Sequence, residues 1–196
     1  MRVRAGIIFT VIVVSVVTVV GALLVGNVRM FRFGPTTASV AMAHAAPGTK
    51  AEFTYLAAQT SNNCSLQPAA VKSYPDNVRI QGSCCSPMDW DHYREQVRDL
   101  RRYHAIAAIP PDPYDVSAAL AKALFAYGDA IHLTQAQQRV YRRAMSITPE
   151  KGPCCCKCWR WHAFAGLSKY LIARKHFSAQ EVASVIALVD GCGGRD

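Results

Sequence analysis

The stretch GPCCCKCWRWH, residues 152–162, places four cysteines within five positions and follows them with two tryptophans, an arginine and a histidine. Adjacent cysteines are poor disulfide partners for each other, so structural cross-linking is not the first explanation of this spacing. The thiolate is the species that binds a soft metal ion or attacks a disulfide bond. The motif therefore points to thiol chemistry.

The chain contains eight cysteines, and an even number in an exported domain makes disulfides the default expectation. Their clustering argues instead for a soft-metal site. The candidate metal ligands are Cys84, Cys85, Cys154, Cys155, Cys158 and Cys192. Secondary candidates are Cys156, the thioether of Met88 and the imidazole of His162, although core packing is the simpler role for Met88. Cys64, in the loop sequence NNCS, has no predicted place in the site.

Both cysteine clusters are predicted to lie at helix N-termini. Ser86 as an N-cap followed by a proline predicts that a helix begins directly after Cys85, and Pro153 predicts another that begins directly before Cys154. The unpaired N–H groups and positive dipole end of a helix N-terminus lower the pKa of a thiol. The predicted helix positions therefore favour thiolates.

Helix signals fill most of the remaining sequence. Capping boxes at Thr134–Gln137 and Ser178–Glu181 are typical of helix starts. The patterns predict an all-α domain at 51–196, a compact bundle of about five helices over 86–103, 116–128, 134–145, 153–174 and 178–190. The proline-rich segment 109–115 is expected to be an extended connection. If the last two helices are antiparallel, Cys192 returns to the cluster that begins at Cys154.

Residues 6–26 form an uncharged apolar run long enough to cross a bilayer as a helix. We expect residues 1–5 to be a short cytoplasmic N-terminus, 6–26 a single transmembrane anchor, 27–50 a linker and 51–196 an extracytoplasmic domain at the cell membrane. A cleaved signal peptide is the alternative, with Ala43–Ala45 as the cleavage site. That site lies far beyond the apolar run, and the run is longer than a signal sequence needs, so a retained anchor is favoured.

The formal net charge is +9, but several arginines flank the apolar run. From Ala46 onward the chain has 18 basic and 13 acidic residues, and it shows no basic stripe with interleaved aromatic residues. Nucleic acid is therefore not an expected partner, and the sequence identifies no protein partner. No hydrolase, phosphate-loop or dinucleotide-binding motif is present, which argues against an enzyme.

Three functions fit these observations. The first is a membrane-anchored binding protein for a soft metal ion of the copper, zinc or mercury class, with copper or zinc as the expected cofactor. The second is a disulfide-stapled structural or interaction module without chemistry of its own. The third is a thiol–disulfide oxidoreductase that uses Cys155 and Cys158 as a CxxC pair. A shared metal site predicts that a sulfur of Cys84 or Cys85 lies within about 4 Å of the second cluster.

Overall fold

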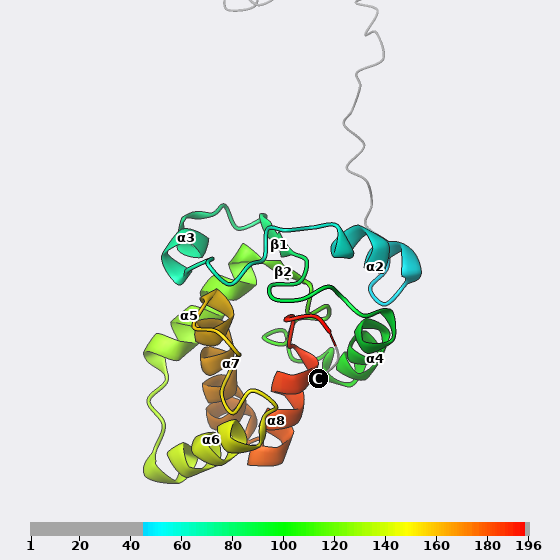
Figure 1. Ribbon diagram of the computed structural model, residues 1–196. Coiled ribbons are helices and arrows are strands. Elements are labelled where there is room, and N and C mark those ends of the chain that lie inside the picture. The colour runs from blue at the N-terminus through cyan, green and yellow to red at the C-terminus, as the bar shows by residue number, and fades with distance from the viewer. Residues whose placement is uncertain (1–44, 195–196) are drawn as a thin grey trace, which may run out of the picture. The chain divides into compact units, whose positions relative to one another are not determined.

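The computed structural model describes residues 45–194, and this part of the chain is mostly helical (Figure 1). Its helices are α2 (Lys50–Ala57), α3 (Pro68–Ser73), α4 (Trp90–Leu100), α5 (Ala118–Ala130), α6 (Gln135–Ile147), α7 (Trp159–Lys175) and α8 (Ala179–Leu188), with a 3-10 helix η1 (Arg101–Tyr103) after α4. Two short strands, β1 (Arg79–Gln81) and β2 (Asp115–Ser117), pair in antiparallel fashion with Ile80 opposite Val116.

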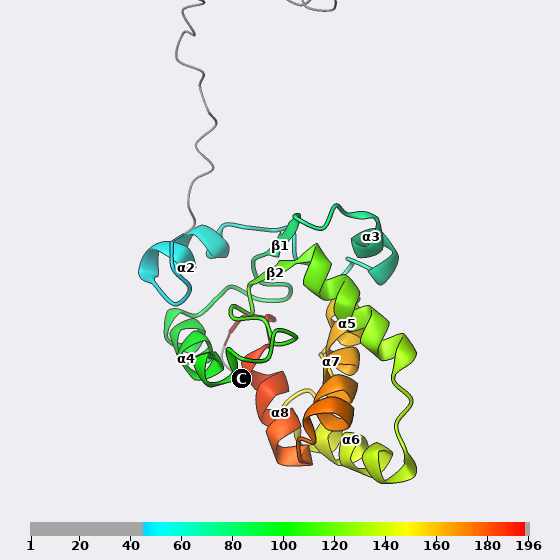
Figure 2. The ribbon, with the colours of Figure 1, turned by 180° about the vertical axis from the view of Figure 1, so that it is seen from behind.

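Helix α7 lies at the centre of the larger hydrophobic core. It packs against α5, α6 and α8, and Figures 1 and 2 show α5 and α8 on opposite sides of it. The buried side of α7 carries Ala163, Phe164, Leu167, Leu171 and Ile172. These residues recur every three to five positions, which is the spacing that keeps one face of a helix turned toward a core. This face holds α7 in place, and the cysteine-rich loop leads directly into the helix.

Helices α5 and α7 approach each other closely because each has a glycine at their contact. The Cα of Gly166 lies against the main chain of α5, where a side chain would overlap the carbonyl oxygen of Leu124. Gly128 faces it, and a Cβ added there would lie 3.6 Å from the Cα of Gly166, an ordinary contact distance. The helix pair therefore depends on Gly166 and tolerates a larger residue at position 128.

A second, smaller core joins α2 to α4. It is formed by Leu56, Tyr93, Val97 and Tyr114, with Met88 packed against it. The backbone N–H of Gly48 donates to the hydroxyl of Tyr93 (3.0 Å). The chain is therefore attached to the domain from within the predicted linker 27–50, and Thr49 caps the first turn of α2.

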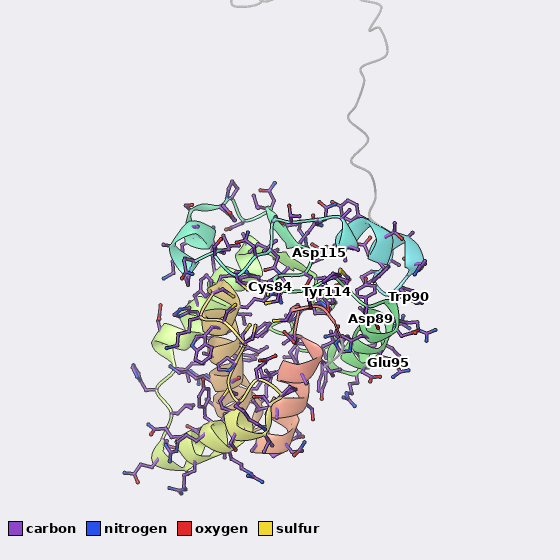
Figure 3. All side chains as sticks on the ribbon, in the orientation of Figure 1. Cys84, Asp89, Trp90, Glu95, Tyr114 and Asp115 are labelled. Carbon is purple, nitrogen blue, oxygen red and sulfur yellow. The ribbon has the colours of Figure 1, made fainter. Side chains whose placement is uncertain are left out.

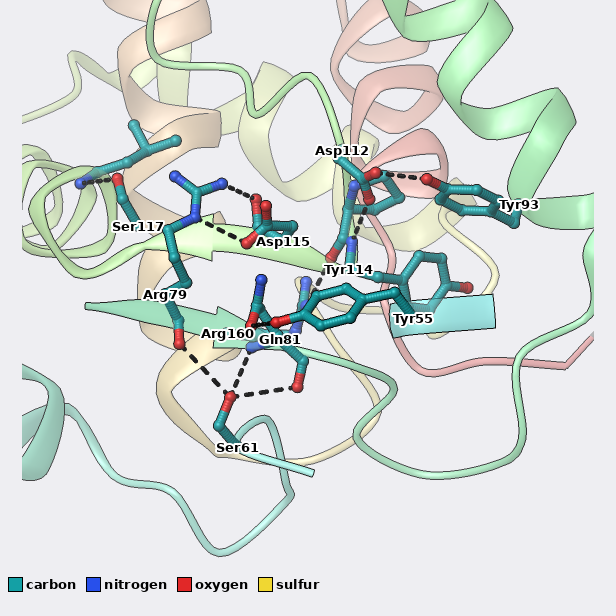
Figure 4. A network of polar contacts seen from close by, with 12 residues as sticks. Tyr55, Ser61, Arg79, Gln81, Tyr93, Asp112, Tyr114, Asp115, Ser117 and Arg160 are labelled. Carbon is teal, nitrogen blue, oxygen red and sulfur yellow. Dashed lines mark hydrogen bonds and ion pairs between the residues drawn. The ribbon is translucent and has the colours of Figure 1, made fainter. Parts of the chain in front are cut away.

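The proline-rich segment 109–115 is irregular, as predicted, but it is largely buried and organises a polar network (Figure 4). The carboxylate of Asp112 accepts hydrogen bonds from the hydroxyl of Tyr93 (2.6 Å) and the backbone N–H of Tyr114 (2.9 Å). Across the two strands, Arg79 forms an ion pair with Asp115 (2.7 Å). These contacts fix the segment between the two hydrophobic cores.

Two predicted helix starts are wrong. Helix α4 begins after Asp89, whose side chain accepts from the N–H of His92 (2.8 Å), and not after Ser86. Ser86 and Pro87 instead form backbone hydrogen bonds with the C-terminal tail. Helix α7 begins at Trp159 and not at Pro153, because residues 148–158 fold as an irregular loop.

The other predicted helices are observed, and both capping boxes are confirmed. The two short helices α2 and α3 were not expected, so a bundle of about five helices underestimates the seven in residues 45–194. The predicted all-α domain contains no strands, so β1 and β2 were both unexpected. The predicted anchor 6–26 lies outside the described residues, and no helix within them is long and apolar enough to span a membrane.

We expect Gly166→Ala to lower the free energy of unfolding by about 3 kcal/mol, because the added methyl group would force α5 and α7 apart. Gly128→Ala is the matched control, and it should be neutral or stabilising by up to about 1 kcal/mol because alanine favours a helix interior. Urea denaturation of both variants measures the difference. Equal midpoints for the two variants would contradict a tight crossing at Gly166.

Asp112 predicts a pH dependence of stability. Burial raises the pKa of its carboxyl to about 6, although the hydrogen bonds from Tyr93 and Tyr114 act in the opposite direction. Since the folded state binds this proton more tightly than the unfolded state, stability falls as the pH rises from about 4 to about 6. We expect Asp112→Asn to gain about 3 kcal/mol relative to the wild type over that interval. Unfolding free energies measured in urea at several pH values test this, and parallel profiles would contradict it.

Candidate metal centre

The sulfur atoms of all eight cysteines form one connected network. They come from four separate stretches of backbone: the loop between α2 and α3, the turn after β1, the loop between α6 and α7, and the tail after α8. Cys84, labelled in Figure 3, marks the position of the network in the fold. Segments more than a hundred residues apart in the sequence therefore supply one site.

The exposed edge of the network joins the two clusters recognised in the sequence. The Cys85 sulfur lies 3.4 Å from that of Cys155 and 3.0 Å from that of Cys64. Cys155 is also 3.3 Å from Cys192. The predicted approach of the two clusters to within about 4 Å is therefore observed. Cys64, which the sequence left unplaced, belongs to the same edge.

The remaining sulfur–sulfur contacts connect Cys84 and Cys156 to the rest of the network. Cys84 lies 3.2 Å from Cys85 and 3.6 Å from Cys192. Cys156 lies 3.2 Å from Cys64. These sulfurs are half-buried apart from the exposed Cys85 and the buried Cys192. The network therefore reaches from the protein surface into the interior.

The buried end of the network consists of Cys154, Cys158 and Cys192. Cys154 lies 3.9 Å from Cys192, as expected if α7 and α8 are antiparallel. The Cys158 thiol interacts with the side chains of both Cys154 and Cys156. Each of the eight sulfurs therefore has at least one other sulfur beside it.

These distances are short enough for neighbouring sulfurs to share a metal ion. They are far longer than the 2.05 Å of a disulfide bond, and residues 45–194, which include every cysteine, contain no disulfide. Four sulfurs held at about 2.3 Å from a tetrahedral metal ion lie roughly 3.8 Å apart, close to the separations of 3.0–3.9 Å observed here.

Four sets of side chains place their ligand atoms within 4.8 Å of one another. They are Cys64–Cys84–Cys85–Cys156, Cys85–Cys155–Cys192, Cys154–Cys155–Cys156 and Cys154–Asp190–Cys192. The cysteines in this part of the chain could therefore hold a metal ion. The sets overlap. Each of the sulfurs of Cys85, Cys154, Cys155, Cys156 and Cys192 belongs to two of them, whereas Cys64 and Cys84 belong to one and Cys158 to none.

Asn62 explains how Cys64 reaches the site. The buried amide of Asn62 donates to the carbonyl of Gly82 (2.9 Å) and accepts from the indole N–H of Trp159 (2.9 Å). The backbone N–H of Trp159 donates to the carbonyl of Leu66 (2.9 Å). The loop that carries Cys64 is therefore attached both to the end of β1 and to the first residue of α7.

Glycines in the C-terminal tail let Cys192 approach the turn after β1. Cys84 donates its backbone N–H to Gly191 (3.1 Å), and Ser86 donates to Cys192 (2.9 Å). Gly193 has a φ of +78°, and a Cβ there would overlap the carbonyl oxygen of Ser86. Only glycine can therefore occupy position 193 without displacing this pairing.

Arg160 lies fully buried beside the network. Its guanidinium donates to the carbonyl of Pro113 (2.6 Å) and more weakly to that of Val189 (3.4 Å), and it lies over the ring of Trp159. Nothing local in the sequence around Arg160 indicates that it is buried. A buried cation is stable only beside compensating negative charge. The positive charge of Arg160 acts to lower the pKa values of Cys84, Cys154 and Asp190, the acidic groups that can provide this charge.

The thiols form two groups, one with lowered and one with raised pKa values. The side chain of Cys158, followed by that of Cys192, lowers the pKa of Cys154 to about 2, and Arg160 adds to this effect. The Cys192 thiol lowers the pKa of Cys84 to about 6 against the effect of burial, again with help from Arg160. Negative charge therefore collects on Cys154 and Cys84.

The other six thiols have raised pKa values. Burial raises those of Cys85 and Cys155 to about 12, and the hydrogen bond with Cys85 raises that of Cys64 to about 12. Cys156, Cys158 and Cys192 are raised as well. Cys158 is the N-cap of α7, and the other seven cysteines lie outside the helices. The pKa shifts arise from burial, neighbouring thiols and Arg160, so helix N-termini do not explain the two clusters as predicted.

Two secondary candidates lie away from the network. Met88 packs in the small core beside Tyr93 and Val97, the simpler role expected for it. His162 is exposed on α7 near Gly128 of α5. The described ligand sets contain neither residue. Cys156, the third secondary candidate, is part of two sets.

The CxxC pair lacks the geometry of a redox motif at a helix start. Cys158 is the N-cap of α7 and is buried, whereas Cys155 lies in the preceding loop and is exposed. The nearest recorded sulfur partners of Cys155 are Cys85 and Cys192. Comparison with protein-family models, with curated proteins and with solved structures finds no match for this chain.

We expect Arg160→Met to lower the free energy of unfolding by about 3 kcal/mol, because it leaves buried carbonyl groups unpaired and thiolate charge uncompensated. Lys157→Met is the matched control, because Lys157 is exposed, and its effect should stay within about 0.5 kcal/mol. Urea unfolding under reducing conditions measures both. A loss for Arg160→Met as small as that of the control would contradict this role.

Proposed function

We propose that this protein binds a soft metal ion of the copper, zinc or mercury class through its clustered cysteine thiolates. One observation carries the proposal: four separate backbone segments bring all eight sulfurs into a single network. Disulfide stapling of a helical domain requires only pairs of cysteines, whereas a metal site requires three or four ligands that converge on one point. Thiolate ligands select soft metal ions over magnesium or calcium.

The gradient of exposure suits a site that takes up and retains a metal ion. Cys85 and Cys155 are exposed and lie side by side, so an arriving ion can meet two thiols at once. Cys154, Cys158 and Cys192 are buried, which excludes water from the bound ion. Ligand exchange from the exposed pair to the buried end would draw the ion inward.

The apolar segment 6–26 completes the proposal. As a retained membrane anchor it would hold the metal-binding domain at the outer face of the cell membrane, joined through the linker 27–50. A thiol cluster in that position would meet metal ions before they enter the cell or as they leave it.

We expect the full-length chain, purified in detergent under anaerobic and reducing conditions, to retain copper or zinc in a fixed ratio. Cys85→Ser should lower the retained metal, while Met88→Leu and His162→Gln should leave it unchanged, because neither side chain lies in the network. Metal content and free thiols are measured on the same samples. Two outcomes would support a disulfide-stapled module instead. One is that the reduced protein retains no metal. The other is that all eight cysteines are in disulfide bonds and the thiols formed by reduction bind no metal.

A further inference from the structure

We infer that the cluster holds several Cu(I) ions bridged by shared thiolates, and not one ion or two independent ions. This inference rests on the proposed function and specifies its cargo. Its basis is the way in which the ligand sets overlap.

Eight sulfurs are too many for one ion, since a tetrahedral site takes four ligands. All eight cysteines nevertheless belong to one network, and none is left over in a separate position. The capacity of the site therefore exceeds one ion.

Two independent four-cysteine sites are the nearest alternative. The set of Cys64, Cys84, Cys85 and Cys156 would form one of them, and the remaining four cysteines the other. Such sites would keep their sulfurs closer to one another than to those of the neighbouring site. The distances between the two halves are 3.4 Å for Cys85–Cys155 and 3.6 Å for Cys84–Cys192. They are only slightly longer than the 3.0–3.2 Å inside the first half and lie within the 3.3–3.9 Å inside the second, so no gap separates the two halves.

The overlap between the ligand sets also argues against two independent sites. Cys155 belongs to a set with Cys85 and Cys192 and to another with Cys154 and Cys156. A thiolate sulfur has enough lone pairs to bind two metal ions at once. A sulfur that lies in two overlapping sets is therefore placed to bridge two ions.

Cu(I) is the ion that this arrangement fits best. It is soft, it binds two or three thiolates, and it accepts bridging sulfur readily, so eight thiolates can serve more than two Cu(I) ions. Zn(II) prefers four ligands of its own. Of the four sets, only Cys64–Cys84–Cys85–Cys156 supplies four sulfurs, so the remaining cysteines offer no second site of that kind.

The test is an anaerobic titration of the reduced full-length chain in detergent with Cu(I), supplied as an acetonitrile complex. We expect more than two Cu(I) ions per chain to bind cooperatively, seen as fully loaded and empty chains together in native mass spectra. X-ray absorption at the copper edge should show copper–copper scattering. Saturation at one or two ions, or loading without copper–copper scattering, would overturn the bridged cluster while leaving soft-metal binding in place.

The Cys155→Ser variant tests the bridging sulfur directly. We expect it to bind fewer Cu(I) ions and to lose cooperativity, because it removes the sulfur that links two sets. Met88→Leu is the matched control and should load like the wild type, because its thioether lies in the small core. Equal loading of both variants would contradict a bridging role for Cys155. A wild-type chain that binds none of copper, zinc or mercury would instead reject the proposed function itself.

Discussion

The buried guanidinium of Arg160 is the interaction on which the arrangement of the site depends. It reaches the proline-rich segment through Pro113, the end of α8 through Val189 and the loop before α3 through Asn62. These contacts bring the elements that carry the cysteines toward the first turn of α7. They also place a positive charge where the thiolates collect, so one residue supports both the fold and the electrostatics of the site.

Irregular backbone is what allows eight sulfurs to converge. Successive residues of a helix point about 100° apart, so a helix would send Cys154, Cys155 and Cys156 in three different directions. In the loop before α7 these three side chains can meet one another and the sulfurs of other segments. The rigid parts of the domain, above all the α5–α7 pair, supply the framework, and the loops and the C-terminal tail supply the ligands. The lowered pKa values of Cys154 and Cys84 arise mainly from hydrogen bonds with other thiols.

The two ends of the cluster differ in exposure and in the pKa values of their thiols. The exposed pair, Cys85 and Cys155, keeps high pKa values, whereas the half-buried Cys84 and the buried Cys154 carry the charge. The thiols of Cys84 and Cys154 therefore lose their protons more readily than those of the exposed pair. A metal ion that bound the exposed pair would displace the protons of those thiols.

The sequence by itself determined the mostly helical class, the two capping boxes, the glycines around Cys192 and the clustering of thiols that could bind a metal ion. These follow from local rules, since a capping box or a glycine acts within a few residues. Only the tertiary structure decided that Cys64 joins the site, that Arg160 is buried and that α7 starts at Trp159. Each of these outcomes depends on contacts between distant segments, such as Asn62 with Trp159 and Trp159 with Leu66, and such contacts leave no local pattern.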